Sequence, residues 1–224
     1  MEDRTLLSLD LSTASVMTIE LLIEDAPDDA LFEEIANANK NRPEVLRILN
    51  DHPETPDTVR QMISDILHVP VRPKTELAKP PKTQEQRTQT ILQKIQKLTV
   101  SERIHLALRG GKEIRSLLLR DPNKEVSMTV LENPKITDQE VEIIARSRSI
   151  SDEALRKITK KREWMKNYSI ILALVTNPKT PTGVALPLLS ELKTRDLSIL
   201  EKNRNVSEGV RGIAKKLSRA RKGH

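Results

Sequence analysis

The chain has 224 residues, enough for one large domain or two small ones, and carries 38 Lys and Arg against 32 Asp and Glu, a net charge of +6. It has no cysteine, which excludes disulfides, thiolate zinc sites and cysteine nucleophiles. Its longest apolar run, from Ile170 to Val175, is far shorter than the roughly 18 residues that a membrane-spanning helix needs.

The N-terminal region, residues 1–68, is acidic and predicted to be helical. Its first residues lack the basic flank and apolar stretch of a secretory signal, so we expect a cytoplasmic protein with no membrane partner. Apolar spacing, together with prolines that a first helical turn tolerates, predicts three helices. These run from Pro27 to about Asn37, from Pro43 to Leu49 and from Pro56 to Leu67.

A proline-rich linker is predicted at residues 69–88, which contain Pro70, Pro73, Pro80 and Pro81 and few large apolar side chains. The charge changes sign there. Residues 1–70 hold 15 acidic and 5 basic side chains, whereas residues 71–224 hold 17 acidic and 33 basic ones. We therefore predict three parts: an acidic helical region at 1–68, the linker, and a basic helical-repeat domain at 89–224.

The basic domain begins with a predicted helix whose apolar stripe contains Ile91, Leu92, Ile95 and Leu98. Further helices are predicted at 101–109, 112–120 and 124–131. The pair Gly110-Gly111 lies between the first two of these. It lacks the spacing of a phosphate-binding loop and is interpreted as a helix stop.

A short turn motif then recurs between helices. It has an Asn or Ser, two variable residues, a small aliphatic residue or Thr, and then Thr, Ser or Pro. It reads NPKITDQEV at 133–141, SRSISDEAL at 147–155, NPKTPTGVA at 177–185 and NRNVSEGVR at 203–211, with weaker copies at 39–46 and 51–59. We expect the Asn to end one helix in the left-handed conformation, and Thr137, Ser151 and Ser207 to cap the next. Thr137 and Glu140 have the spacing of a capping box.

These patterns predict an all-α fold, an irregular helical-repeat solenoid of short antiparallel helices. The fourth motif positions are 14, 30 and 26 residues apart, which allows one or two short helices per unit. Short helices must stack on their neighbours to bury an apolar face. The core should be aliphatic, because the only aromatic residues are Phe32, Trp164 and Tyr168.

At these motifs the chain resembles bacterial α-helical repeat proteins of the leucine-rich-repeat-variant and HEAT-like kind, best over 177–189 and 133–144. The segment from Arg115 to Leu192, with RDPNKEV at 120–126 and REWMKNY at 162–168, also resembles an uncharacterised bacterial family. The resemblance covers about the last half of the chain and implies a helical scaffold without an activity. One leucine-rich-repeat-variant type holds an iron–sulfur cluster, for which this chain has no cysteine ligands, so no cofactor is expected.

Catalytic patterns are weak in this sequence. The histidines are scattered, at His52, His68, His105 and His224, and none has the i+4 partner of a helical metal site. The acidic residues of 20–34 are interpreted as a solvated face. With no nucleophile–base pair and no ligand cluster, we expect a protein that is not an enzyme and takes no small-molecule substrate.

The candidate binding surface is a basic stretch beside two aromatic residues. It comprises Arg156, Lys157, Lys160, Lys161, Arg162, Trp164, Lys166 and Tyr168. On one continuous helix Trp164 and Tyr168 would share a face, and the surface could hold a nucleic-acid backbone or an acidic protein. The alternative is that both rings fill an aliphatic core while the cations are solvated. A basic tail, from Lys215 to Lys222, offers a second cationic segment.

The predicted function is a non-catalytic scaffold that binds another protein along a helical-repeat surface. The alternative is a nucleic-acid-binding repeat protein that uses the basic C-terminal domain. The acidic residues 1–70 could either dock on that domain or form a separate protein-binding surface.

Overall fold

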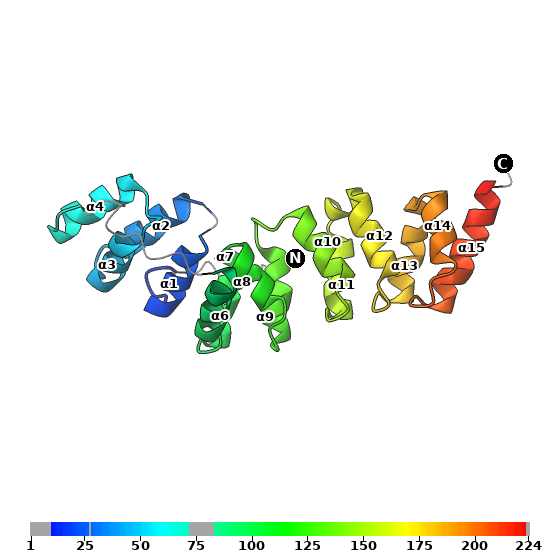
Figure 1. The fold of residues 1–224 in the computed structure, drawn as a ribbon, viewed down its shortest axis with the longest axis horizontal. Coiled ribbons are helices and arrows are strands. Elements are labelled where there is room, and N and C mark those ends of the chain that lie inside the picture. The colour runs from blue at the N-terminus through cyan, green and yellow to red at the C-terminus, as the bar shows by residue number, and fades with distance from the viewer. Residues whose placement is uncertain (1–9, 27, 72–82, 223–224) are drawn as a thin grey trace, which may run out of the picture. The chain divides into compact units, whose positions relative to one another are not determined.

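The computed structural model describes residues 10–26, 28–71 and 83–222, and all the regular secondary structure in these ranges is helical. They contain fourteen α-helices and three short 3-10 helices (Figure 1). The prediction of an all-α protein is therefore confirmed for the described residues. The chain forms two compact units, unit 1 at residues 1–135 and unit 2 at residues 136–224.

Unit 1 contains eight described α-helices and one 3-10 helix. They are α1 (Val16–Glu24), α2 (Ala30–Ala38), α3 (Pro43–Asp51), α4 (Asp57–Leu67), α6 (Gln84–Ile95), α7 (Val100–Arg109), α8 (Lys112–Leu118), α9 (Lys124–Thr129) and η1 (Val130–Glu132). The predicted helices are present to within a few residues, except that α2 begins at Ala30. Pro27, where that helix was predicted to begin, lies outside the described residues.

Helix α1 was not predicted, yet it is central to unit 1. Its sequence VMTIELLIE is apolar on most sides, and Ile19, Leu21 and Leu22 are fully buried. It packs against α2 and α3 on one side and against α6 and α7 on the other. One aliphatic core runs from Leu11 to Val130, so the acidic helices and the first basic helices bury each other's apolar faces.

The division into units differs from the predicted regions at 1–68, 69–88 and 89–224. Residues 72–82 of the predicted linker lie outside the described residues, but residues 84–88 belong to α6, which Thr83 starts with a capping box to Gln86. Ion pairs also join the acidic helices to basic residues of unit 1. They are Lys94–Glu20 at 3.0 Å, Lys135–Asp28 at 2.7 Å and Arg109–Glu34. Shared apolar burial and opposite charge thus place the boundary near residue 135.

The paired glycines end α7 and begin α8, as predicted, but through close packing and not through a left-handed backbone. A Cβ on Gly111 would lie 2.0 Å from the backbone oxygen of Asp25. A Cβ on Gly110 would lie 2.7 Å from a methyl group of Ile114. Only glycine leaves room for α1 and α8 to meet here.

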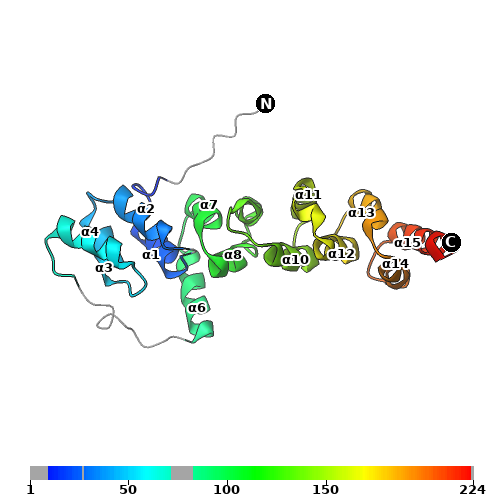
Figure 2. The same cartoon turned by 90° about the horizontal axis from the view of Figure 1, so that it is seen from above.

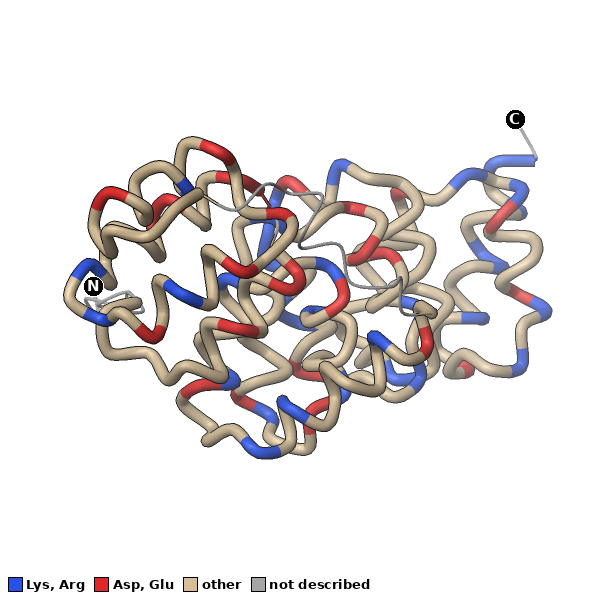
Figure 3. The backbone as a smooth tube through the Cα atoms, turned by 60° about the vertical axis from the view of Figure 1, so that its left-hand side comes forward, with Lys and Arg blue, Asp and Glu red and all other residues tan. Residues whose placement is uncertain are grey.

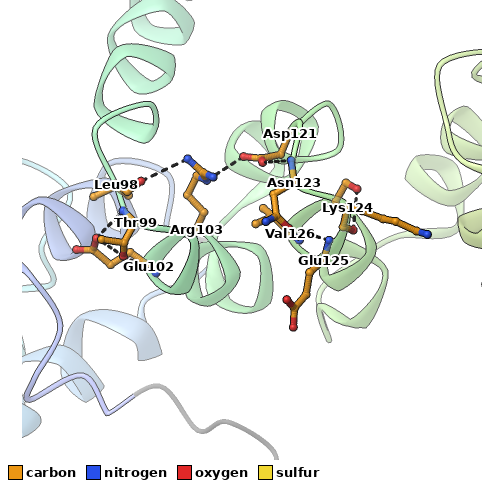
Figure 4. A network of polar contacts seen from close by, with 10 residues as sticks. Leu98, Thr99, Glu102, Arg103, Asp121, Asn123, Lys124, Glu125 and Val126 are labelled. Atoms are coloured by element: carbon orange, nitrogen blue, oxygen red, sulfur yellow. Dashed lines mark hydrogen bonds and ion pairs between the residues drawn. The ribbon is translucent and has the colours of Figure 1, made fainter.

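The segment RDPNKEV builds a polar network between α7 and α9 (Figure 4). Arg103 forms an ion pair of 3.0 Å with Asp121 and donates to the carbonyl of Leu98. The Asp121 carboxylate accepts from the amide of Asn123, whose side chain in turn caps α9 by accepting from Glu125 and Val126 amides. This motif therefore has a structural role.

Unit 2 contains six described α-helices and two 3-10 helices. They are α10 (Asp138–Arg146), α11 (Asp152–Lys160), η2 (Trp164–Lys166), α12 (Tyr168–Thr176), α13 (Thr182–Leu188), η3 (Leu189–Glu191), α14 (Thr194–Leu200) and α15 (Glu208–Lys222). In Figure 2, α10, α12 and α14 lie along one side of the unit, and α11 and α13 lie along the other. Helix α15 packs against α13 and α14.

The turn motif connects helices through a buried amide side chain. Asn177 donates to the carbonyls of Ala145 and Ser147, at 2.7 and 3.0 Å, where α10 ends. In unit 1, Asn133 does the same to Ala107 and Gly110 at the end of α7, at 2.9 and 3.2 Å. Each Asn thereby satisfies carbonyls that a helix end leaves open.

The backbone of the motif differs from the prediction. Asn133 and Asn177 have φ of −59° and −78°, so neither is left-handed, and the prediction of that conformation is wrong. The side chain instead accepts from the amide two residues later, Lys135 or Lys179. The predicted caps are confirmed: Thr137 forms the capping box with Glu140, and the Ser151 and Ser207 hydroxyls accept from Ala154 and Val210.

Candidate macromolecule-binding surface

The eight residues of the predicted surface lie in unit 2, spread over α11, η2 and the start of α12. The side chains of Arg156, Lys160, Arg162 and Lys166 are exposed, and those of Lys157 and Lys161 are half-buried. Arg156 lies 3.8 Å from Asp152, one turn earlier on α11. The basic members of the set are thus largely accessible to solvent.

Trp164 is a core residue. Its side chain is only 5% exposed, and the Lys161 ammonium lies 4.2 Å from the centre of its ring. A cation over an indole face is favourable, typically by about 0.5–1 kcal/mol at exposed sites. The ring is thereby covered and offers no face to a ligand.

Tyr168, the first residue of α12, is held by the start of α14. Its hydroxyl donates to the Asp196 carboxylate and accepts from the Lys193 amide at 3.1 Å, and the Lys193 ammonium lies 5.0 Å from the ring centre. Burial and the hydrogen bond to Asp196 raise the pKa of Tyr168. The sequence suggested that Trp164 and Tyr168 share one continuous helix. They do not, because Asn167 ends η2 and caps α12.

The contacts of Tyr168 bring together cations that are distant in sequence. They place residues 161–168 beside residues 193–196, and Arg221 of α15 joins the same edge by donating to the carbonyls of Leu192 and Ser190. We call this end of unit 2 the cationic edge. Its exposed cations include Lys160, Arg162, Lys166, Lys193, Arg219 and Lys222. The basic end of α15 is visible beside the C mark in Figure 3.

None of those six cations forms an ion pair with a carboxylate of the described residues. The acids nearby are the exposed Glu163, Glu191 and Asp138, of which Asp138 accepts from the Asn167 side chain at 3.1 Å, and the half-buried Asp196. The sequence had indicated the basic stretch and the basic tail separately. Lys193, a single lysine in a polar loop, carries no sequence signal, and only the fold places it between them.

The other end of unit 2 carries acids beside its cations. It holds the motif turns at 147–151, 177–181 and 203–207, which the bonds from Asn177 to Ser147 and from Thr182 to Ser207 place side by side. We call it the motif edge. Its exposed cations, Arg148, Lys179 and Arg204, are accompanied by the exposed acids Asp152, Glu153 and Glu208.

An open pocket of about 450 Å³ in unit 1 is lined by a pair of carboxylates, Asp25 and Glu113, among other residues. Burial is the main cause of a raised pKa at Asp25, and the Glu113 charge adds to it. Both groups already serve the fold. Asp25 accepts from the Ile114 amide at 2.8 Å, and Glu113 accepts from Thr88 and pairs with Arg87 at 3.4 Å.

Comparisons of the chain with protein-family models, with curated proteins and with solved structures find no match. In the ranges that the structure describes, no helix has both the length and the apolar character needed to cross a bilayer. The same ranges contain no group of three or more His, Asp or Glu side chains placed to hold a metal ion.

Proposed function

We propose that this protein is a non-catalytic scaffold whose stacked helix pairs form a solenoid and bind another protein. The recurring turn motif supports the stacking part of the proposal. In each unit a buried Asn ties the end of one helix to the end of an earlier one, through carbonyls of Ala107 and Gly110 or of Ala145 and Ser147. A joint that recurs along a chain is typical of repeat proteins, which use extended surfaces for binding.

The observation that carries the binding part is a pair of exposed isoleucines in unit 2. Ile143 on α10 is 66% exposed and Ile199 on α14 is 58% exposed. Each lies four residues before the first residue of a turn motif, Ser147 or Asn203, and both helices lie on the same side of the unit (Figure 2). Burying an isoleucine contributes about 1.5–3 kcal/mol, so a partner that covers both gains substantially.

The rim of these isoleucines indicates the chemistry of the partner. Arg195 and Lys202 are exposed and lie one turn before and after Ile199, whereas Arg146, one turn after Ile143, is paired with Glu142 at 2.6 Å. Charged rims around apolar anchors favour partners of opposite charge. The partner is therefore a protein with an apolar patch bordered by acidic side chains.

Affinity purification from the native cell, with nuclease treatment in one arm, tests this function. We expect a protein that the wild-type chain retains after nuclease and that the double variant Ile143→Ser/Ile199→Ser loses. The captured protein, once purified, should bind the double variant roughly 100-fold more weakly, because about 3 kcal/mol of apolar burial is lost. Leu92→Ser, which alters an exposed apolar side chain of unit 1, is the matched control and should bind as wild type.

Two outcomes would remove this proposal. One is the repeated recovery of no protein partner. The other is a purified partner that binds the double variant and the wild type equally well.

A further inference from the structure

The cationic edge carries exposed cations that are paired with no carboxylate of the described residues. Unit 2 has 19 Lys and Arg against 10 Asp and Glu, a net charge of +9, whereas unit 1 has 19 against 22. On the motif edge, cations and acids alternate, but on the cationic edge Lys160, Arg162 and Lys193 have no carboxylate partner in the described residues. Like charges gathered at one edge repel one another, so this arrangement lowers the stability of the folded protein when no anion is bound.

Helix dipoles explain only some of these cations. Cations are stabilising at a helix C-terminus, which accounts for Lys160 on α11 and for Arg219 and Lys222 on α15. Lys166 lies in the last turn of η2, two residues before α12, whereas Lys193 is the N-cap of α14. A cation at the N-cap of a helix is disfavoured, by about 0.3–1 kcal/mol, so the helix dipole does not explain Lys193.

The cationic edge lacks the anchors of a protein or membrane interface. The large apolar side chains that are exposed in the described residues are Val71, Leu92, Val100, Ile143 and Ile199. None of them belongs to residues 160–168, 189–194 or 219–222. Protein interfaces rely on buried aromatic and apolar groups, and so do peripheral membrane proteins, whereas nucleic acid can be held by charge alone through counterion release.

The aromatic residues favour a duplex over a single strand. Proteins that bind single strands stack bases on exposed rings. Trp164 is 5% exposed under Lys161, and Tyr168 is held by Asp196 and the Lys193 amide, so neither ring is available for stacking. A duplex carries its phosphates on the outside, so a surface without a stacking ring can still bind it through charge.

We propose that the cationic edge binds the phosphate backbone of double-stranded nucleic acid without regard to sequence. The edge is built from three successive layers, which are α11 with α12, α13 with α14, and α15. Packed helices lie about 8–10 Å apart, so the cations extend over roughly 20 Å. Phosphates of one strand recur every ~3.4 Å along the duplex axis, so the edge spans about six base pairs. Contacts to phosphates carry no sequence information, so binding through these cations should not depend on sequence.

Fluorescence anisotropy with a labelled 20-base-pair DNA duplex of arbitrary sequence, and with the matching RNA duplex, tests the proposal over salt concentrations of about 50 to 200 mM. We expect binding of at least one duplex that weakens steeply with salt. The triple variant Lys160→Gln/Arg162→Gln/Lys193→Gln should bind roughly tenfold or more weakly, and the slope of log K against log salt should fall by about 2 to 3. DNA and RNA arms distinguish the two sources of the same phosphate backbone.

The matched control neutralises three cations of the motif edge, with Arg148→Gln, Lys179→Gln and Arg204→Gln, and changes the net charge equally. It should retain wild-type affinity to within about twofold and the wild-type salt slope. Equal losses in both variants would overturn the proposal, as would a failure of the wild type to bind either duplex at low salt. Polyglutamate that competes as well as unlabelled duplex would assign the edge to an acidic protein instead.

This inference does not rest on the proposed protein partner. The double variant Ile143→Ser/Ile199→Ser should bind the duplex like the wild type, and the triple variant of the cationic edge should retain the protein partner. Failure of one proposal therefore leaves the other testable.

Discussion

The two units treat their basic residues in opposite ways. In unit 1 several arginines serve the fold: Arg60 is fully buried and donates to the carbonyls of Asn50, His52 and Thr55, and Arg42 donates to those of Ser12 and Ala14. Others pair with acids, as in the bridge of Arg103 to Asp121. In unit 2, with as many basic residues and fewer than half as many acids, most cations of the cationic edge remain solvated.

This difference shows that composition alone does not reveal what a basic residue does. A guanidinium has five donors and can satisfy several helix-end carbonyls at once, which makes it a structural group where carbonyls converge. An exposed lysine without a partner contributes little to stability. Cations of the second kind are free to bind an external anion, and they are concentrated in unit 2.

The largest effect is expected where a buried cation of unit 1 is removed. Arg60→Met should lower the free energy of unfolding by about 3 kcal/mol or more, because three turn carbonyls lose their donor and remain buried. Urea unfolding followed by far-UV circular dichroism measures it. Arg162→Met, at an exposed position of unit 2, should change stability by less than about 0.5 kcal/mol. Equal effects at the two positions would contradict the contrast between the units.

The motif asparagines should behave alike in the two units, despite the difference in charge. Asn177→Ala and Asn133→Ala should each cost about 2–3 kcal/mol, because two buried carbonyls lose a hydrogen bond in each case. Asn205→Ala, an exposed control in the last motif, should cost less than about 0.5 kcal/mol. The same unfolding measurement applies. A motif asparagine whose loss is no costlier than that of Asn205 would have no role in joining helices.

Local signals predicted the helices but not what joins them. Proline positions, apolar spacing and the capping box of Thr137 and Glu140 are short-range patterns, and they predicted most helix bounds closely. The amide bonds of Asn177 reach carbonyls 30 and 32 residues away, so no local pattern reveals them. Helix α1 was missed because its sequence lacks the contrast between polar and apolar faces that marks an amphipathic helix.

The candidate surface was predicted in part. The basic residues near 156–166 are exposed as the sequence indicated, but the two rings are not part of an open face. Asn167 carried a usable signal, since Asn favours the N-cap of a helix and here caps α12. Recognising it would have separated Trp164 from Tyr168. Lys193 joins the edge only through the tertiary contacts of Tyr168.

Tyr168 allows the structural and binding roles of unit 2 to be separated. Tyr168→Phe removes the bonds to Asp196 and the Lys193 amide and should lower the free energy of unfolding by about 1–2 kcal/mol. Unfolding can be followed by the fluorescence of Trp164, the one tryptophan in the sequence, which lies in unit 2. Duplex affinity should stay within about twofold of wild type, because the ring makes no stacking contact. A large loss of affinity in a stable variant would make the ring part of the binding site.

The smallest effect concerns Asp25 of unit 1, the acid whose burial raises its pKa above the ordinary value of 3.8. The folded state then holds the Asp25 proton more tightly than the unfolded state. The free energy of unfolding therefore falls as pH rises from the unfolded pKa through the raised folded pKa, and the loss persists at neutral pH. Asp25→Asn does not ionise and keeps an oxygen for the Ile114 amide, so it should remove this part of the fall.

Urea unfolding at several values from about pH 4 to about pH 7 measures the effect of Asp25. Relative to wild type, Asp25→Asn should gain stability toward neutral pH, whereas Asp29→Asn, at an exposed acid of the same unit, should follow the wild-type profile. A variant profile parallel to wild type would mean that Asp25 is solvated in the folded protein. In that case this carboxylate would not oppose folding.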